Sequence, residues 1–358
     1  MSEALQRVVR SAVELLEIPS ETGDEGRIAE HLMGRLGGAV LHRLVRAGHS
    51  IAVAPRPLDP SRRTVMLLGH SDTVPAHGDE PVRQDGDRLY GLGASDMKGA
   101  LAVMLEIASR TAAEAPRDNL ILVFYAAEEG SYAGNELPVI REAVSEWFGA
   151  TDLGLCLEPT DGRLELGCLG TAHATVTFGG TRAHSARPWQ GENAIHKAAP
   201  LLQRLAARGT ASFTFDGLEF VESMSATTVG FRGARNVVPD RFQLNVNYRF
   251  APGKTEHDVR TELEQLVAGE ATCELIDFCP SGRVCRDNAL LQELARAAGD
   301  PPVAAKQAWT DVGRLSQWGI DAANWGPGAT SQAHQAGEWV SIMALGAALT
   351  ALERWQFG

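Results

Sequence analysis

The stretch TVMLLGHSDTVP (Thr64–Pro75) joins an uninterrupted apolar run to a histidine and an aspartate. Apolar runs of this length, without alternation, are typical of strands that are buried on both faces of a sheet covered by helices. We expect such strands at 64–68, 120–127 and 153–157, and helices near 3–17, 25–36 and 98–113. Strands that alternate with helices predict an α/β fold for the first 170 residues.

The pattern changes after about residue 170. Ala172–Phe178 and Phe242–Phe250 alternate apolar and polar side chains, as half-exposed antiparallel strands do. Further strands are expected at 225–231 and 271–278, and helices at 193–206 and 256–267. We therefore predict a catalytic domain made of residues 1–170 and 279–358, in which 279–358 forms helices and short loops. An α+β domain at 171–278, with two helices on one face of an antiparallel sheet, is inserted into it.

Composition excludes several classes of function. A length of 358 residues favours two domains over one. The formal net charge of −12 argues against nucleic-acid and anionic-membrane partners, and no apolar run approaches the roughly 20 residues of a membrane span. Five cysteines without a CxxC pair argue against a disulfide framework and a thiolate zinc site. The N-terminus lacks the apolar core of a signal peptide, so we expect a cytoplasmic protein.

His70 follows the first apolar run, at the carboxyl end of the predicted strand, where open α/β sheets place their ligands. Asp72 lies two positions later, within reach of the second imidazole nitrogen. A carboxylate there fixes the tautomer of a metal-binding histidine and orients its ring. Taken alone, one His-x-Asp pair equally describes a hydrogen bond in a loop.

Asp96 lies in GLGASDMKG, between a glycine-rich turn and the helix expected from Lys98. One interpretation is a helix N-cap, a common position for aspartate. The other is a metal ligand, because the two oxygens of a carboxylate can bridge two metal ions. The segment has neither the GxGxxG spacing nor the GK[ST] ending of a phosphate-binding loop.

Three more acidic residues and a second histidine complete the set. Glu128 and Glu129 follow LILVFYAA directly, and adjacent strand residues point to opposite faces, so one can bind metal while the other acts as a general base. Glu158 ends LGLCLE before a proline, and His334 lies in a loop before the C-terminal helix. Imidazole and carboxylate ligands without thiolate suit Zn²⁺, with Mn²⁺ or Co²⁺ as substitutes.

The ordered set HSDTVP, GLGASDMKG, EEG, EPT and AHQAGE spans nearly the whole chain and resembles the co-catalytic zinc aminoacylase/carboxypeptidase family. The resemblance implies two zinc ions per subunit, with Asp96 as the bridging ligand. It places His70 and Glu158 on one metal, and Glu129 and His334 on the other. It also implies that Glu128 is the general acid/base and that Asp72 is the partner of His70.

The same resemblance implies that the inserted domain is a lid that pairs with its copy in a homodimer. Within TRAHSARPWQGENAIHK, His184 would reach the active site of the partner subunit and stabilise the tetrahedral oxyanion. A surface histidine with its own hydrogen bonds is the simpler interpretation of His184. His196 falls inside a predicted helix, and we give it a structural role.

Within this family, the segments AHSARPWQGENAIHK, NVVPDRFQLNVNYRF and WTDVGRL resemble the succinyl-diaminopimelate desuccinylases of actinobacterial type. That resemblance implies substrate contacts from Thr310, Arg314, Asn236 and Arg187. An arginine suits this substrate because a planar guanidinium binds a carboxylate through two hydrogen bonds. Arg187 replaces a tyrosine of the better-known enzymes, and the arginine that they carry near GCLGT is absent here.

The implied activity is metal-dependent hydrolysis of N-succinyl-L,L-2,6-diaminopimelate, a step toward lysine and cell-wall precursors. An N-acetylornithine deacetylase, or a broader hydrolase of N-acyl amino acids, keeps the same chemistry with another substrate. A non-catalytic binding protein on the same fold is the alternative from another class.

Overall fold

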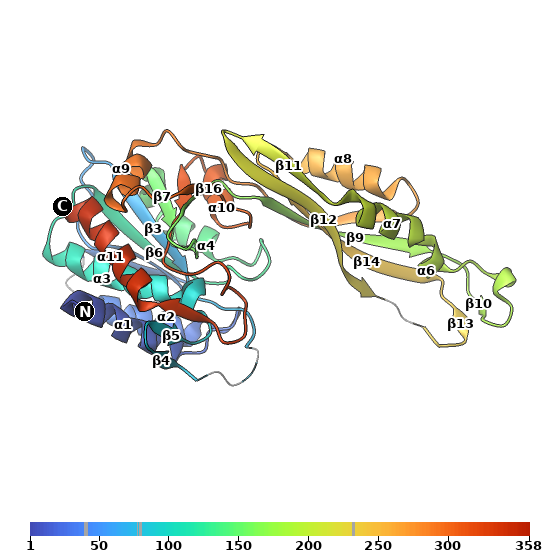
Figure 1. Cartoon of the computed structure of the whole chain (residues 1–358), viewed down its shortest axis with the longest axis horizontal. Helices are drawn as coiled ribbons and strands as arrows, with labels where there is room; N and C mark the ends of the chain where they lie inside the picture. Colours follow the sequence, from blue (N-terminus) through green and yellow to red (C-terminus); the bar gives the residue numbers. More distant parts are fainter. Residues whose placement is uncertain (39–41, 77, 79–80, 231–232) are drawn as a thin grey trace. The chain divides into compact units, whose positions relative to one another are not determined.

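The computed structural model describes residues 1–38, 42–76, 78, 81–230 and 233–358, which form two compact units (Figure 1). The first unit comprises Met1–Gly167, Arg283–Ala304 and Thr310–Gly358, and the second comprises Cys168–Gly282 and Ala305–Trp309. The predicted inserted domain, 171–278, lies within the second unit. No helix of the described segments is long and apolar enough to cross a bilayer.

The first unit is built on an eight-stranded mixed sheet, in the order β1-β2-β6-β3-β7-β17-β8-β16. Its central strands, β6, β3, β7 and β17, are parallel to one another. The strands are β1 (Arg43–Ala47), β2 (Ser50–Ala54), β3 (Thr64–His70), β6 (Asn119–Tyr125), β7 (Leu153–Cys156), β8 (Leu164–Leu166), β16 (Val303–Ala305) and β17 (Ala322–Asn324). All residues of β3, β6 and β7 are buried, as their unbroken apolar runs require, so the α/β prediction is confirmed.

Several strands of the first unit were not predicted. The hairpin β1–β2 and the three-residue strands β8, β16 and β17 lack a strong pattern, and β17 reads only Ala-Ala-Asn. The expectation of helices and short loops alone for 279–358 was therefore wrong. A separate three-stranded sheet is formed by β4 (Arg83–Asp85), β5 (Arg88–Tyr90) and β18 (Trp339–Ser341).

Helices of the first unit pack on the sheet and on one another. The amphipathic helix α1 (Glu3–Leu16) is N-capped by Ser2 and packs against α3 (Gly99–Ala113) and α11 (Ile342–Phe357). The other helices are α2 (Gly26–Gly37), α4 (Leu137–Ala143), α5 (Ser145–Gly149), α9 (Ala289–Ala297) and α10 (Val312–Gln317). An irregular turn, η1 (Ala94–Lys98), leads into α3.

The second unit is a five-stranded antiparallel sheet, in the order β11-β12-β14-β9-β15, packed against α6, α7 and α8 (Figure 1). Its elements are β9 (Gly170–Gly179), α6 (Ala194–Lys197), α7 (Ala199–Arg208), β11 (Thr210–Phe215), β12 (Leu218–Gly230), β14 (Arg241–Phe250), α8 (Glu256–Val267) and β15 (Thr272–Cys279). Alternate residues of β9 and β14 are buried, as their pattern predicted.

Two details of the second unit differ from the prediction. The helix expected at 193–206 is divided into α6 and α7, because Pro200 falls in the first turn of α7 and cannot donate to a preceding carbonyl. The strand expected at 225–231 begins earlier, at Leu218, and residue 231 lies outside the described residues. A small two-stranded sheet joins β10 (Ala183–His184) to β13 (Val237–Val238).

Candidate metal centre

The parallel arrangement of β3, β6 and β7 brings their carboxyl ends to one edge of the sheet. His70 is the last residue of β3, Glu128 and Glu129 follow β6, and Glu158 follows β7. The backbone reaches Glu128 through Ala127, which has a left-handed φ of 58°. Both glutamates therefore lie in a turn beyond the strand, so the predicted strand end at 127 was wrong, and the opposite-face argument does not apply.

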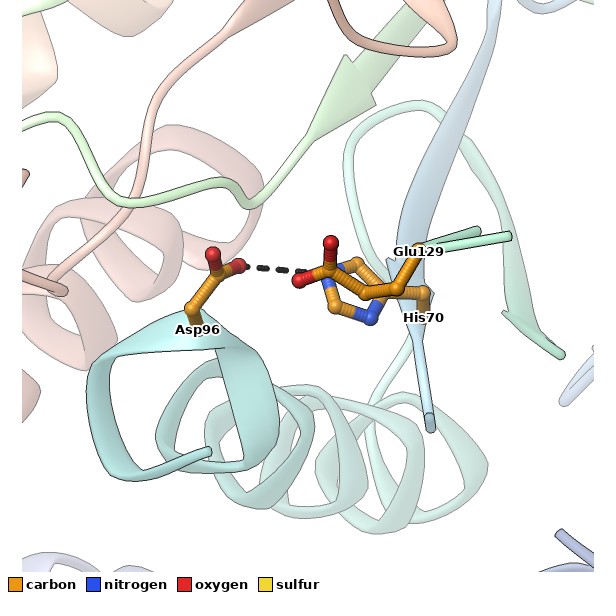
Figure 2. Close-up of side chains that lie close together, drawn as sticks. All are labelled: His70, Asp96 and Glu129. Carbon is orange, nitrogen blue, oxygen red and sulfur yellow. Dashed lines mark hydrogen bonds and ion pairs between the residues drawn. The ribbon is translucent and has the colours of Figure 1, made fainter. Parts of the chain in front are cut away.

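His70, Asp96 and Glu129 form a compact group of possible metal ligands. One ligand atom from each residue lies within 4.8 Å of the others, and His70 Nε2 is 3.1 Å from Asp96 Oδ1. Figure 2 shows the Asp96 carboxylate directed toward the imidazole, which is 1% exposed. Asp96 is not the N-cap of α3, because that position belongs to Lys98. The capping interpretation was therefore wrong.

His334 joins this group from the distant C-terminal segment. Its Nε2 lies 2.9 Å from Glu129 Oε1 and 3.7 Å from Asp96 Oδ2. Asp96 thus has one oxygen toward each histidine. Glu158 is buried, and its charge contributes to the raised pKa of Glu128, so it belongs to the same acidic surroundings. It lies outside the three-residue group found among the described residues.

These residues fit a divalent cation. Burial alone would lower the pKa of His70, but hydrogen bonds to Asp72 and Asp96 and the charge of Glu128 raise that pKa well above its ordinary value. A buried imidazole among carboxylates that raise its pKa marks a place where the negative charge needs a compensating positive charge. A metal ion can replace the proton there and offset the same negative charge. Nitrogen and oxygen donors without thiolate suit Zn²⁺, Mn²⁺ or Co²⁺.

Asp72 is fully buried and connects the centre to the turn that carries the glutamates. Its Oδ1 accepts the backbone N–H of Glu128 at 3.0 Å, and its Oδ2 accepts that of Glu129 at 3.0 Å and the hydroxyl of Thr22 at 2.9 Å. His70 Nδ1 lies 3.1 Å from the Asp72 carbonyl and 3.5 Å from Oδ1. The expected contact with His70 is present. The hydrogen bonds from Asp72 to the backbone of Glu128 and Glu129 were not indicated by the sequence.

Glu128 has the electrostatic character of a proton-transfer group. Loss of solvation raises the pKa of its carboxyl well above the ordinary value, and the negative charges of Glu158 and Glu129 act in the same direction. The His70 imidazole opposes this shift. A carboxyl group whose pKa is raised toward neutrality is better suited to general acid/base catalysis.

Arg314, in α10, belongs to a buried network beside the glutamate turn. Its Nε donates to Asp311 Oδ1 at 2.9 Å, its Nη2 donates to the Tyr132 carbonyl at 2.7 Å, and its guanidinium lies over the Tyr132 ring at 3.8 Å. Asn135 Nδ2 donates to Asp311 Oδ2 at 2.8 Å. Arg314 is 5% exposed, and Thr310, which precedes it by four residues, is also buried. The roles of Asp311 and Tyr132 were not predicted.

The remaining predicted residues lie together in the second unit. His184 is exposed in β10, and its Nδ1 accepts the backbone N–H of Ala186 at 3.0 Å. The Asn236 carbonyl accepts the N–H of Ser185 at 2.9 Å, and the His184 carbonyl accepts that of Arg187 at 2.8 Å. The structure therefore brings His184, Arg187 and Asn236 together, in two exposed segments that are hydrogen-bonded to each other. His196 lies in α6, as predicted.

Two buried charged residues near the centre were missed. The carboxylate of Glu338 accepts three backbone N–H groups around Asp96, and burial raises its pKa to about 7. Lys98 Nζ donates to the Ile18 carbonyl at 2.7 Å, and burial lowers its pKa to about 8. The only signal for Glu338 was its place four residues after His334 in AHQAGE.

Comparison with known proteins found relatives that match most of the chain. The sequence model of Peptidase family M20/M25/M40 matches residues 66–355. A Mycobacterium tuberculosis protein provisionally named succinyl-diaminopimelate desuccinylase is 39% identical over 346 residues, which cover 96% of each chain. The succinyl-diaminopimelate desuccinylase of Corynebacterium glutamicum is 37% identical over 331 residues, which cover 90% of this chain and 89% of that protein.

Solved structures share the fold at low sequence identity. Aminopeptidase PepT from Bacillus cereus has a TM-score of 0.78 at 18% identity, with 98% of this chain and 97% of that chain covered. A dinuclear metal-binding peptidase from Bacillus subtilis has a TM-score of 0.73 at 14% identity, with 98% and 97% covered. These similarities extend over both units of the chain.

Proposed function

Because this chain belongs to peptidase family M20/M25/M40, whose members are metal-dependent hydrolases, we propose that it hydrolyses N-succinyl-L,L-2,6-diaminopimelate to succinate and L,L-diaminopimelate. One observation carries the choice of substrate: the similarity to the mycobacterial relative extends over 96% of both chains. The grouped donors of His70, Asp96 and Glu129, with Glu128 next to them, support the hydrolytic chemistry. The proposal includes a cytoplasmic location, and five cysteines without a CxxC pair suit such a reducing compartment.

The proposed cofactor is a pair of Zn²⁺ ions per subunit, for which Co²⁺ or Mn²⁺ can substitute. Asp96 would be shared, with His70 and Glu158 on one side and Glu129 and His334 on the other. When bound, such a pair polarises the scissile carbonyl and lowers the pKa of the attacking water. The positions of both Asp96 oxygens, one toward each histidine, support the shared role.

The side chains of this protein would move the proton and orient the reacting groups. Glu128 takes a proton from the attacking water and later delivers it to the leaving amine. Asp72 holds Glu128 in place through its backbone N–H, and Glu129 likewise. His184 of the partner subunit would stabilise the oxyanion, a charge that exists only in the transition state.

Arg314, with Thr310, Asn236 and Arg187, would recognise the substrate. Two of the Arg314 nitrogens are engaged by Asp311 and Tyr132, whereas Nη1 has no hydrogen-bond partner among the residues that the structure describes. We propose that Nη1 binds a substrate carboxylate that an acetylated amino acid lacks. A charge-assisted hydrogen bond of this kind is worth about 1.5–3 kcal/mol, or about 10- to 100-fold in affinity.

The test of the function compares two substrates with zinc-loaded wild-type protein and Arg314→Ala. For the wild type we expect kcat/KM to favour N-succinyl-L,L-diaminopimelate over N-acetyl-L-ornithine by about a hundredfold or more. Arg314→Ala should raise KM for the succinyl compound about 10- to 100-fold more than for the acetyl compound. The ratio is the readout because loss of packing on Tyr132 affects both substrates. A preference for the acetyl compound would assign the deacetylase alternative, and equal changes would remove Arg314 from substrate recognition.

A homodimer through the second unit is part of the proposal. Within the second unit, β11 pairs with β12 only as far as Ser223, so Ser225–Gly230 of β12 has β14 as its one partner strand among the described residues. This edge is exposed, and Val229 is 68% exposed. Ile195 and Leu202 also expose apolar side chains on α6 and α7. An unpaired strand edge beside exposed apolar residues supports pairing with a second copy.

Mixing two inactive variants tests both the dimer and the role of His184. In a hybrid of His184→Ala with Glu128→Gln, one site keeps its own Glu128 and receives His184 from the partner. Random exchange makes about half of the dimers hybrids, so activity should return to roughly a quarter of the wild-type value. Sedimentation of each variant checks that it is dimeric. Mixtures that stay inactive, or an active monomer, would contradict a histidine supplied by the partner.

A further inference from the structure

Glu338 lies immediately before β18, and its side chain is directed at the backbone around Asp96. Oε1 accepts the N–H of Ser95 at 2.7 Å and that of Asp96 at 2.9 Å, and Oε2 accepts the N–H of Gly93 at 2.7 Å. The Glu338 carbonyl also accepts the N–H of Gly91 at 3.0 Å. The residue is 1% exposed. A single side chain thus binds most of the turn that carries the proposed bridging ligand.

The turn accepts the N–H groups of Ala94 and Lys98 with its own carbonyls, but those of Gly93, Ser95 and Asp96 bond to Glu338. Asp96 and Met97 have non-helical backbone angles, and Gly93 has a left-handed φ of 80°. A Cβ on Gly93 would lie 2.8 Å from a methyl carbon of Thr73, so the turn also passes too close to Thr73 for a larger residue. Buried N–H groups outside a regular helix need acceptors from elsewhere in the protein. Glu338 supplies them for three residues.

The short segment from His334 to Glu338 carries both a proposed ligand and the carboxylate that binds the Asp96 turn. His334 lies four residues before Glu338, and its Nε2 is 3.7 Å from Asp96 Oδ2, whereas Asp96 Oδ1 is 3.1 Å from His70 Nε2. The Asp96 side chain must therefore be held in one orientation, so that each of its oxygens faces one histidine. Ser95 adds a second attachment, because its hydroxyl donates to the Trp339 carbonyl at 2.7 Å and accepts the N–H of Ala329 at 3.1 Å.

We propose that Glu338 is a positioning residue of the metal centre, which acts through the backbone of Asp96 and does not itself bind metal. The Glu338 carboxylate joins the Asp96 turn to the segment of His334. It thereby sets the distance between Asp96 and His334, two proposed ligands that lie far apart in the sequence. The inference rests on the proposed metal chemistry. It adds that the affinity for metal depends on a group that has no contact with the ion.

The experiment measures zinc affinity and stoichiometry by equilibrium dialysis for the full-length protein and for Glu338→Gln. Glutamine keeps one oxygen for Ser95 and Asp96 but places an amide NH₂ against the N–H of Gly93. Loss of an outer contact of this kind typically weakens metal binding about 10- to 100-fold, and we expect that range here. The kcat should recover when zinc is raised to saturation, because Glu128 and the ligands are intact. A purely structural role would lower Tm without changing metal affinity.

Asp118→Asn is the matched control. Asp118 is also a buried carboxylate of the first unit, but it lies just before β6, at the opposite end of the strand from the glutamate turn, and pairs with Arg63 at 3.0 Å. This variant should lose stability and keep the zinc affinity of the wild type. If Glu338→Gln does not fold, Ser95→Ala removes the second attachment and should weaken zinc binding in the same direction.

The outcomes separate this inference from the proposed function. Wild-type affinity in Glu338→Gln, or in Ser95→Ala where the first variant does not fold, would overturn the positioning role and leave the hydrolase proposal intact. An equal loss of affinity in Asp118→Asn would also overturn it, because general instability would then explain the effect. A wild-type protein that binds no zinc, cobalt or manganese would remove the proposed function itself.

Discussion

Glu128→Gln is expected to lower kcat by about 10²- to 10⁴-fold while the metals stay bound. Glutamine has nearly the shape of glutamate but cannot take a proton from water or return one to the amine. The backbone N–H that anchors residue 128 to Asp72 is unchanged by the substitution, so the turn should keep its position. The measurement is kcat with the succinyl substrate at saturating zinc, together with the zinc content of the same sample.

Glu129→Gln is the contrasting variant for this experiment. Glu129 is adjacent to Glu128 and has the same backbone anchor, but its carboxylate lies with the donors of His70 and Asp96. It should lose metal, whereas Glu128→Gln should not. Activity close to the wild type in Glu128→Gln would eliminate the proposed base. It would also leave the raised pKa of Glu128 without a catalytic use.

Asp96→Ala is expected to abolish both metal binding and turnover. Its two oxygens face His70 and His334, so the substitution removes the group proposed to be shared by both metals. Charge stabilisation by bound metal is worth several kcal/mol, which corresponds to a rate loss of about a thousandfold or more. The measurement is zinc stoichiometry and kcat/KM after chelation and reloading. The wild type should recover its activity on reloading, and Asp96→Ala should not.

Asp161→Ala provides the comparison for Asp96→Ala. Asp161 is a carboxylate of the same unit whose Oδ2 accepts from Thr330, in a turn after Glu158. Its removal should change activity little. Two equivalents of zinc retained by Asp96→Ala would show that this carboxylate is not shared between the metals, and the ligand assignment would then have to be revised.

The sequence predicted best those features that follow directly from a local pattern. The buried strands β3, β6 and β7 contain unbroken apolar runs. His70 is the last residue of β3, and Glu128 and Glu129 are the first charged residues after β6. Strands of three residues could not be predicted, because β17 derives its stability from pairing with β7 and β8 and not from its own side chains. Tertiary context determines such elements.

The missed residues of the site share a physical cause. Glu338 binds backbone N–H groups, as Asp72 does in addition to its predicted contact with His70. Every residue except proline has such a group, so no pattern of side chains reveals these partners. The network of Asp311 and Arg314 likewise includes the carbonyl of Tyr132. The proposed ligands could be predicted from residue type and motif, whereas the groups that hold them in place are revealed only by the three-dimensional structure.

The division of the first unit along the chain has a consequence for biosynthesis. Strand β17 lies between β7 and β8 in the sheet, but it follows nearly all of the second unit in the chain. Nearly all of the second unit is one continuous segment and can fold before β17 has been synthesised, whereas the first sheet stays divided between β7 and β8 until β17 joins it. A nascent chain therefore exposes β7 as a temporary edge until Ala322–Asn324 pairs with it, and an unpaired edge of this kind can associate with other chains.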